Sequence, residues 1–178
     1  MAIARLGATE LIRRGVIAGA AGGLAEIVWV SLYATITGGN AATIARGVTT
    51  AAGVTAMLPA APVSMGIVVH MALAVLLGIA LAGLWQALAR RDVGVISLTG
   101  VMLAALTAVW AMNFFVILPA LSPPFIALLP YPVSLISKLL FGLAAAETLR
   151  RCAAPEAVGL PRAVRVRVAS NRKAQLPR

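Results

Sequence analysis

Four long apolar stretches alternate along the chain with connections rich in small residues, proline or arginine. The stretches cover residues 15–37, 63–88, 93–118 and 132–149. Each is close to or above the roughly 20 residues that a helix needs to cross about 30 Å of hydrocarbon. Because lipid offers no hydrogen-bond partners to a bare backbone, such stretches are expected to be helical. The pattern predicts an all-α integral membrane protein, with a four-helix bundle as the transmembrane domain over residues 15–149.

The connection at residues 38–62 is apolar and rich in small residues. Asn40 can cap a helix, and the segment 41–58 that follows has a weak helical tendency, which Pro59 and Pro62 bring to an end. We expect an interfacial or re-entrant helix that lies against the bundle. The sequence leaves open which of the two it is.

The other two connections differ in length and composition. Residues 89–92 form a link so short that the second and third spans are expected to be antiparallel neighbours. Residues 119–132 contain five prolines and no charged residue. We expect their apolar side chains to rest in the outer membrane interface, with Tyr131 near the lipid headgroups. Those apolar side chains are Phe125, Ile126, Leu128 and Leu129.

Composition excludes an ordinary water-soluble domain. Hydrophobic residues make up 61% of the 178 residues and charged residues only 11%, and the mean hydropathy is +0.99. A soluble domain is typically about half apolar and one quarter charged. The sequence has none of the motifs GxSxG, HExxH, CxxC or Walker, and its single Cys152 and single His70 give few ligands to a metal or haem. We therefore expect no enzymatic activity, no catalytic residue, no cofactor and no metal.

Charge is distributed unevenly along the chain, whose formal net charge is +10. Basic residues precede the first span, occupy the second connection and follow the fourth span, while Arg46 stands alone on the opposite side. Cytoplasmic loops hold the excess of Lys and Arg in membrane proteins. Both termini and the link 89–92 are therefore predicted to be cytoplasmic. This topology accounts for the basic charge without a nucleic-acid partner.

Two segments, residues 1–14 and 150–178, lie outside the four spans. We interpret the first as a cytoplasmic surface segment and the second as a basic cytoplasmic tail with too little apolar surface to fold alone. Each basic residue near anionic headgroups contributes about 1 kcal/mol of attraction. We expect this tail to contact anionic lipids of the bilayer or another membrane-protein subunit. The residues expected to make that contact are Arg162, Arg165, Arg167, Arg172 and Lys173.

Four polar residues interrupt the apolar spans: Glu26, His70, Asn113 and Lys138. An ionisable group at a helix centre costs about 2.5–3.5 kcal/mol on insertion scales, so each one requires a reason. A rise of about 1.5 Å per residue places the last three at one level, in the outer third of the membrane. Glu26 lies deeper, near the midplane. The sequence thus predicts a polar layer inside the membrane.

Small residues share a helix face with the three ionisable groups, at spacings of three and four residues. Helices approach closely along such rows. We expect the rows to bring His70, Lys138 and Asn113 within reach of one another, with Glu26 available to Lys138 if that side chain bends inward. The glycines of these rows are Gly15, Gly19, Gly22 and Gly23 in the first span, Gly66 and Gly78 in the second, and Gly142 in the fourth.

Three interpretations of this layer stay open. In the first, the polar groups hydrogen-bond one another or backbone carbonyls and fix the helix register, while Lys138 extends outward. In the second, Glu26, His70 and Lys138 line a proton or solute pathway. In the third, His70 binds a metal or pigment with Met65 or Met71 nearby, although one imidazole is a small ligand set.

Motifs in the second to fourth spans carry a family resemblance. They are the run from Gly66 through His70 to Gly78, then Leu118-Pro119, Leu121, Pro123-Pro124, Leu129-Pro130-Tyr131, Phe141-Gly142, and Glu147 followed by Arg150-Arg151. On these motifs the chain resembles the YagU-like family of bacterial inner-membrane proteins. The resemblance implies a four-span inner-membrane protein linked to acid resistance, with His70 and Glu147 at matching positions. The chain departs from the family pattern at Lys138 and Leu143, near which acidic or imidazole side chains are expected.

Two functional hypotheses follow. The first is a non-enzymatic accessory or stabilising subunit of a larger inner-membrane complex, which docks through its glycine rows and its basic tail. The alternative is a small proton-linked transporter or channel, associated with acid resistance, with Glu26, His70 and Lys138 along its path. In the first case these residues stabilise the assembled complex, and in the second they carry protons or solute across the membrane.

Overall fold

The fold is that of a computed structural model, which describes residues 7–89, 91 and 94–153. Over these residues every regular element is a helix, so the predicted all-α class is confirmed. The basic side chains expected to contact lipid or a partner lie outside the described residues; they are Arg162, Arg165, Arg167, Arg172 and Lys173.

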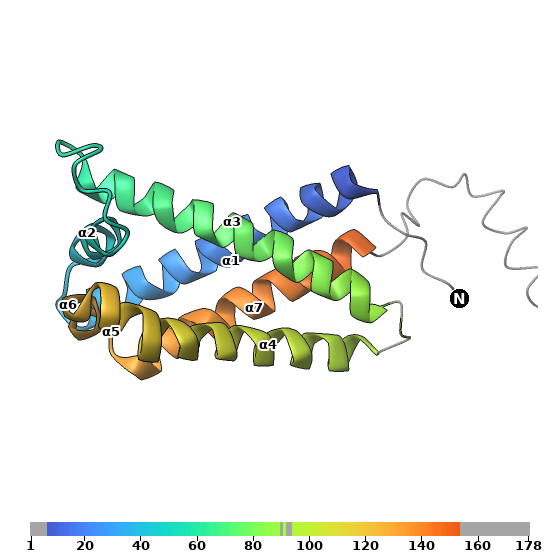
Figure 1. Ribbon diagram of the computed structural model, residues 1–178. Coiled ribbons are helices and arrows are strands. Elements are labelled where there is room, and N and C mark those ends of the chain that lie inside the picture. Colours follow the sequence, from blue (N-terminus) through green and yellow to red (C-terminus); the bar gives the residue numbers. More distant parts are fainter. Residues whose placement is uncertain (1–6, 90, 92–93, 154–178) are drawn as a thin grey trace, which may run out of the picture.

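Four long helical segments form the bundle (Figure 1). They are α1 (Ala8–Ile36), α3 (Pro62–Ala89), α4 (Val95–Met112) with its continuation through the π-helix η1 (Asn113–Ile117) and α5 (Leu118–Leu121), and α7 (Tyr131–Ala153). All four segments are long and apolar enough to cross a bilayer. The chain is therefore a multi-pass membrane protein, as its hydropathy pattern predicts.

The bundle has two ends, which we name by the elements found there. The terminal end is where α1 begins and α7 ends, and the loop end is the opposite one, which carries the short helices α2 (Ala41–Ala51) and α6 (Pro123–Leu128). At the terminal end α1 begins at Ala8, ahead of the predicted start at residue 15. Glu10 lies 2.8 Å from Arg13 and 2.6 Å from Arg14, and ion pairs one turn apart stabilise a helix. The polar turn before the first apolar stretch is therefore helical.

The long helices are not all neighbours. Helix α1 packs along both α3 and α7, and α4 packs along α7. Helices α3 and α4 contact each other over few residues, because they lie close at the terminal end and diverge toward the loop end (Figure 1). The expectation that the second and third spans are neighbours holds only near their link, since a short link fixes only the ends that it joins.

Backbone contact between α1 and α3 sets the position of α3. A Cβ atom on Gly78 would meet the Gly15 carbonyl oxygen and the Gly19 backbone. Likewise, a Cβ atom on Gly19 would meet the backbone of Ala74 and Val75. Only glycine allows helices to approach this closely. The glycine rows of these two helices are therefore used inside the chain.

The remaining glycines of the predicted rows make separate contacts. A Cβ atom on Gly22 would meet Phe141, and one on Gly23 would meet Ala74 and Met71. A Cβ atom on Gly142 would meet Leu103 and Leu106, and one on Gly66 would meet Ala45 and Thr49. Of these, Gly66 does not join two spans. Its neighbour is α2, the short helix of the first connection.

Helix α2 is capped at its start and tied to α3 near its end. The Asn40 side chain accepts a hydrogen bond from the Ala42 amide at 2.8 Å, as predicted for a cap. Near its other end, the Thr49 hydroxyl donates to the Pro62 carbonyl oxygen at 2.5 Å. The helix stops at Ala51, short of the predicted limit at residue 58, and Gly53 follows with a φ of +69° that favours glycine.

The proline-rich connection is folded onto the protein. Leu129 is buried, and Phe125 and Ile126 pack against a cluster made of Trp110, Phe114 and Leu118. The side chains that we expect in the membrane interface are thus also in contact with the protein. Prolines at the start of α6 are compatible with helix, because the first turn has no amide partner to lose.

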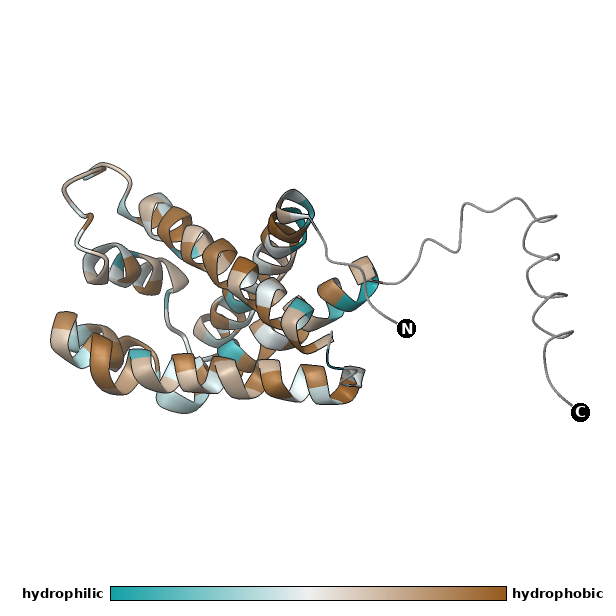
Figure 2. Cartoon of the chain, turned by 45° about the vertical axis from the view of Figure 1, so that its right-hand side comes forward, coloured by the Kyte–Doolittle hydropathy of each residue, from teal (hydrophilic) through white to brown (hydrophobic). Residues whose placement is uncertain are grey.

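Apolar side chains fill the terminal half of the bundle and also cover its outside. Buried there are Leu81, Trp85, Leu98, Met102, Leu106, Phe141 and Leu149, which belong to one core cluster. Figure 2 shows apolar residues along the outward faces of the long helices as well. Leu24, Val28 and Leu76 are examples of exposed apolar side chains. An apolar exterior of this kind suits a lipid environment.

Candidate functional site

The centre of the candidate site is Glu26, a carboxylate that is only 4% exposed. Its Oε1 atom lies 2.7 Å from the Lys138 ammonium nitrogen and accepts a hydrogen bond from the Ser137 hydroxyl at 3.4 Å. Glu26 belongs to α1, and its two partners belong to α7. The bundle thus contains an ion pair between two membrane-spanning helices.

His70 approaches the other oxygen of the same carboxylate from α3. Its Nε2 atom lies 3.7 Å from Glu26 Oε2 and 3.3 Å from the Gly23 carbonyl oxygen. In the tautomer that carries a proton on Nε2, the ring donates to that carbonyl. Glu26 Oε2 is buried and has no hydrogen-bond partner within the described part of the chain. One carboxylate oxygen is therefore paired, and the other faces an imidazole.

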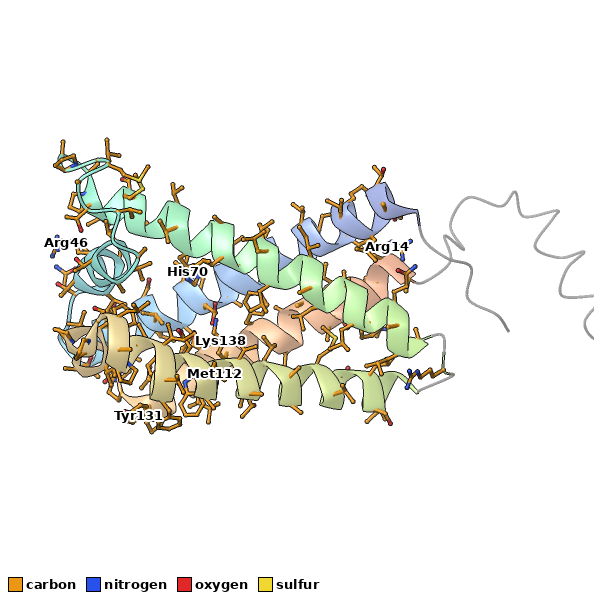
Figure 3. All side chains as sticks on the ribbon, in the orientation of Figure 1. Arg14, Arg46, His70, Met112, Tyr131 and Lys138 are labelled. Atoms are coloured by element: carbon orange, nitrogen blue, oxygen red, sulfur yellow. The ribbon has the colours of Figure 1, made fainter. Side chains whose placement is uncertain are left out.

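Lys138 points inward and not toward a membrane surface. Besides the Glu26 carboxylate, its ammonium group faces the ring of Phe141, with the nitrogen 5.3 Å from the ring centroid. A cation over an aromatic face is stabilised by the electrons of the ring. The outward extension that one interpretation assigns to Lys138 is therefore not the conformation found. Figure 3 shows His70 and Lys138 in the region between the long helices.

Close helix packing explains why three helices meet at Glu26. Gly22 and Gly23 come one turn before it on α1, and they admit Phe141 of α7 on one side and Met71 of α3 on the other. Side chains on α3 and α7 near these contacts consequently reach the next turn of α1, where Glu26 lies. The structure brings together the three ionisable groups that the glycine rows led us to expect near one another.

Asn113 stands apart from the three ionisable groups. It begins the π-helix η1, and among the described residues no hydrogen bond joins it to Glu26, His70 or Lys138. A π-helical turn shifts the register of a helix and is frequent at functional sites. Asn113 nevertheless lines the same cavity as the other three.

A cavity of about 620 Å³ lies in the loop half of the bundle, beside the ion pair. Its walls come from all four membrane-spanning segments, and α2 and α6 also contribute residues. The polar and ionisable side chains in its lining are Glu26, Ser31, His70, Asn113, Ser134, Ser137 and Lys138, and the rest of the lining is apolar. The volume lies within the range of about 300–1,000 Å³ that is usual for small-molecule sites.

Sequence reasoning missed several members of this site. The Ser137 hydroxyl, the Gly23 carbonyl and the Phe141 ring all depend on contacts between helices. The spacing of Phe141, one turn after Lys138, is the only local signal that was available. The cavity has no local signal, because it results from the divergence of α3 and α4.

Two tryptophans, Trp29 and Trp110, satisfy their ring N–H groups within the protein. Trp29 donates to the Val133 carbonyl oxygen at 3.0 Å, and Trp110 donates to the Ser134 hydroxyl at 3.0 Å. Both bonds tie a neighbouring helix to the start of α7, close to Lys138 in sequence. These bonds fix the position of the loop end of α7, which lies beside the cavity.

No family model, curated protein or solved structure matches the chain. The resemblance to the YagU-like family therefore stays a prediction. Within the residues that the structure describes, no group of three or more His, Cys, Asp and Glu side chains is placed to hold a metal ion.

Proposed function

We propose that this chain is a non-enzymatic, proton-linked transporter, with Glu26, His70 and Lys138 as its coupling site. The observation that supports the proposal is a buried, ion-paired carboxylate in the wall of a cavity between membrane-spanning helices. Ionisable groups inside membranes are costly and commonly mark proton or ion routes. An ion pair that only fixed helix register would need neither a cavity beside it nor an unpaired carboxylate oxygen.

The two oxygens of Glu26 suggest how a proton is coupled to helix movement. Oε1 is held by Lys138, whereas Oε2 faces His70. A proton taken up at Nδ1 makes His70 an imidazolium, which passes its Nε2 proton to Glu26 Oε2 and returns to a neutral ring. This transfer neutralises the carboxylate and removes the attraction on Lys138. Because a buried charge without a partner is costly, Lys138 must then leave the position it holds, and α7 loses a tie to α1.

The position of the cavity in one half of the bundle also supports transport. The cavity lies in the loop half, while apolar side chains such as Trp85, Met102 and Leu106 fill the terminal half. Transporters alternate between states that open to one side of the membrane. With both termini in the cytoplasm of a bacterium, as the charge distribution predicts, the cavity of this state would lie in the outer half of the inner membrane.

The accessory-subunit hypothesis has less support. The glycine rows proposed to dock a partner are used in contacts within the chain, and the basic tail lies outside the described residues. If that hypothesis held, Glu26→Gln or His70→Gln would alter assembly with a partner and leave proton flux unaffected.

The experiment is proton flux in liposomes made from a bacterial lipid extract, driven by an imposed pH gradient and read with an internal pH-sensitive dye. We expect the protein to speed the decay of the gradient, and Glu26→Gln and His70→Gln to return it to the rate of protein-free liposomes. Glu10→Gln is the matched control, because it neutralises an acid on the same helix that lies at the surface, with a side chain 31% exposed. Equal rates with and without protein would overturn the proposal.

A further inference from the structure

The wall between α3 and α4 is both the side of the cavity and part of the outer surface. Several residues that line the cavity are also exposed: Ile67 and Leu73 on α3, Val109 on α4, Ile117 in η1 and Leu121 in α5. All five are apolar. The two helices diverge at this level (Figure 1). An opening at this level would let a molecule dissolved in the bilayer reach the cavity sideways, without passing through water.

The charges in the cavity favour a neutral ligand. The positive charge of Lys138 is matched by Glu26 at 2.7 Å, and Arg46, on the nearby helix α2, is not among the lining residues. A phosphate or carboxylate head group would find no unpaired cation in the lining. It would also approach the negative charge of Glu26, which opposes its binding.

The unpaired carboxylate oxygen favours a ligand that donates a hydrogen bond. Glu26 Oε2 is buried, and it has no partner among the described residues, although Glu26 lines the cavity. A buried acceptor without a donor is costly, and a hydrogen bond to a charged acceptor is among the stronger ones. Oε2 has almost no accessible surface, so the side chains around it must shift to admit a ligand, and a hydroxyl group placed there would then satisfy it.

We propose that the cavity binds a membrane-soluble molecule with an apolar body and a neutral hydroxyl head, which enters between α3 and α4 and donates its hydrogen bond to Glu26 Oε2. This inference rests on the same site as the proposed transport function and names the class of molecule that the site takes. The apolar lining holds the body, and the ion pair keeps the carboxylate charged and in place as the acceptor.

The test uses three probes of equal chain length: 1-dodecanol, dodecanoate and dodecane. Binding of a photoreactive dodecanol to the full chain in nanodiscs is followed by mass spectrometry, with each unlabelled probe as competitor. We expect labels on the α3 and α4 residues at the cavity mouth, and at least about tenfold stronger competition by dodecanol than by the other two, as the loss of one charge-assisted hydrogen bond implies. Equal or stronger competition by dodecanoate or dodecane overturns the inference.

Two sets of variants test the head group and the route. Combining Glu26→Leu with Lys138→Met removes the acceptor and both charges together, and it should abolish the preference for dodecanol over dodecane while apolar binding remains. Leu73→Trp should block the mouth. Leu76→Trp is its matched control, because the two leucines are 60% and 64% exposed on the same helix, but only Leu73 lines the cavity. A preference that survives the double change, or equal effects of the two tryptophans, contradicts the inference.

Binding and transport can fail separately. Dodecanol binding without proton flux would leave the inference standing and overturn the proposed transport function. Proton flux that depends on Glu26, without a preference for the alcohol, would support the transport function and overturn the inference about the ligand.

Discussion

The two halves of this bundle are built from the same helices but are packed in opposite ways. In the terminal half, large apolar side chains from α3, α4 and α7 close on one another around Met102, Leu106 and Phe141, all of which have no exposed surface. In the loop half the same helices enclose a cavity and an ion pair. The difference does not come from composition, since both halves are mainly apolar.

Helix direction accounts for the contrast. Glycine contacts hold the middle of α3, from Met71 to Ile79, against α1, while α4 follows α7. Helices α3 and α4 meet only near their link, so the space between them widens toward the loop end and is covered there by α2 and α6 (Figure 1). A membrane bundle can therefore combine a closed half and a hollow half without any change in the kind of helix. The following predictions test this account, beginning with the largest expected effect.

The contact that positions α3 should be the most sensitive point of the bundle. We expect Gly78→Leu to cost more than about 4 kcal/mol of unfolding free energy, because its side chain would meet the backbone of α1 at Gly15 and Gly19. Gly83→Leu on the same helix is the control, since a Cβ atom there meets nothing within 4 Å. The measurement is unfolding in mixed micelles. Similar losses for both variants would show that glycine contact does not decide the position of α3.

The ion pair should be the next most sensitive feature. Lys138→Met leaves Glu26 buried without its partner, and we expect a loss of about 3–5 kcal/mol. Adding Glu26→Leu should restore most of that loss, because two matched apolar residues replace two charges. Arg13→Met removes an ion pair at the exposed start of α1 and should change nothing measurable. A double variant as unstable as the single one would contradict the role of charge pairing.

A third comparison sets the closed half directly against the hollow half. Leu106→Ala should cost about 2 kcal/mol or more, because it opens a gap in a fully buried contact with Gly142. Val109→Ala, on the same helix but in the cavity wall and 43% exposed, should cost less than about 0.5 kcal/mol. The test is to measure the free energy of unfolding of both variants. Equal costs would mean that the two halves are packed alike.

Hydropathy and spacing predicted much of the fold and part of the site. The four spans, the Asn40 cap and the internal polar groups could be read from the sequence, because each depends on residues close together in the chain. The glycine rows also indicated which faces of α1 and α3 approach. The end of α2 at Ala51 and the π-helix at Asn113 departed from regular helical expectation.

The sequence by itself determined that this chain spans a membrane with four helices, because apolar length and backbone hydrogen bonding leave lipid-exposed segments no other structure. It also determined that Glu26, His70 and Lys138 must be accommodated inside. Only the tertiary structure decided that Lys138 pairs with Glu26, that His70 faces the free oxygen, and that a cavity opens beside them. These features depend on helix directions and distances between residues far apart in the chain, which no local pattern specifies.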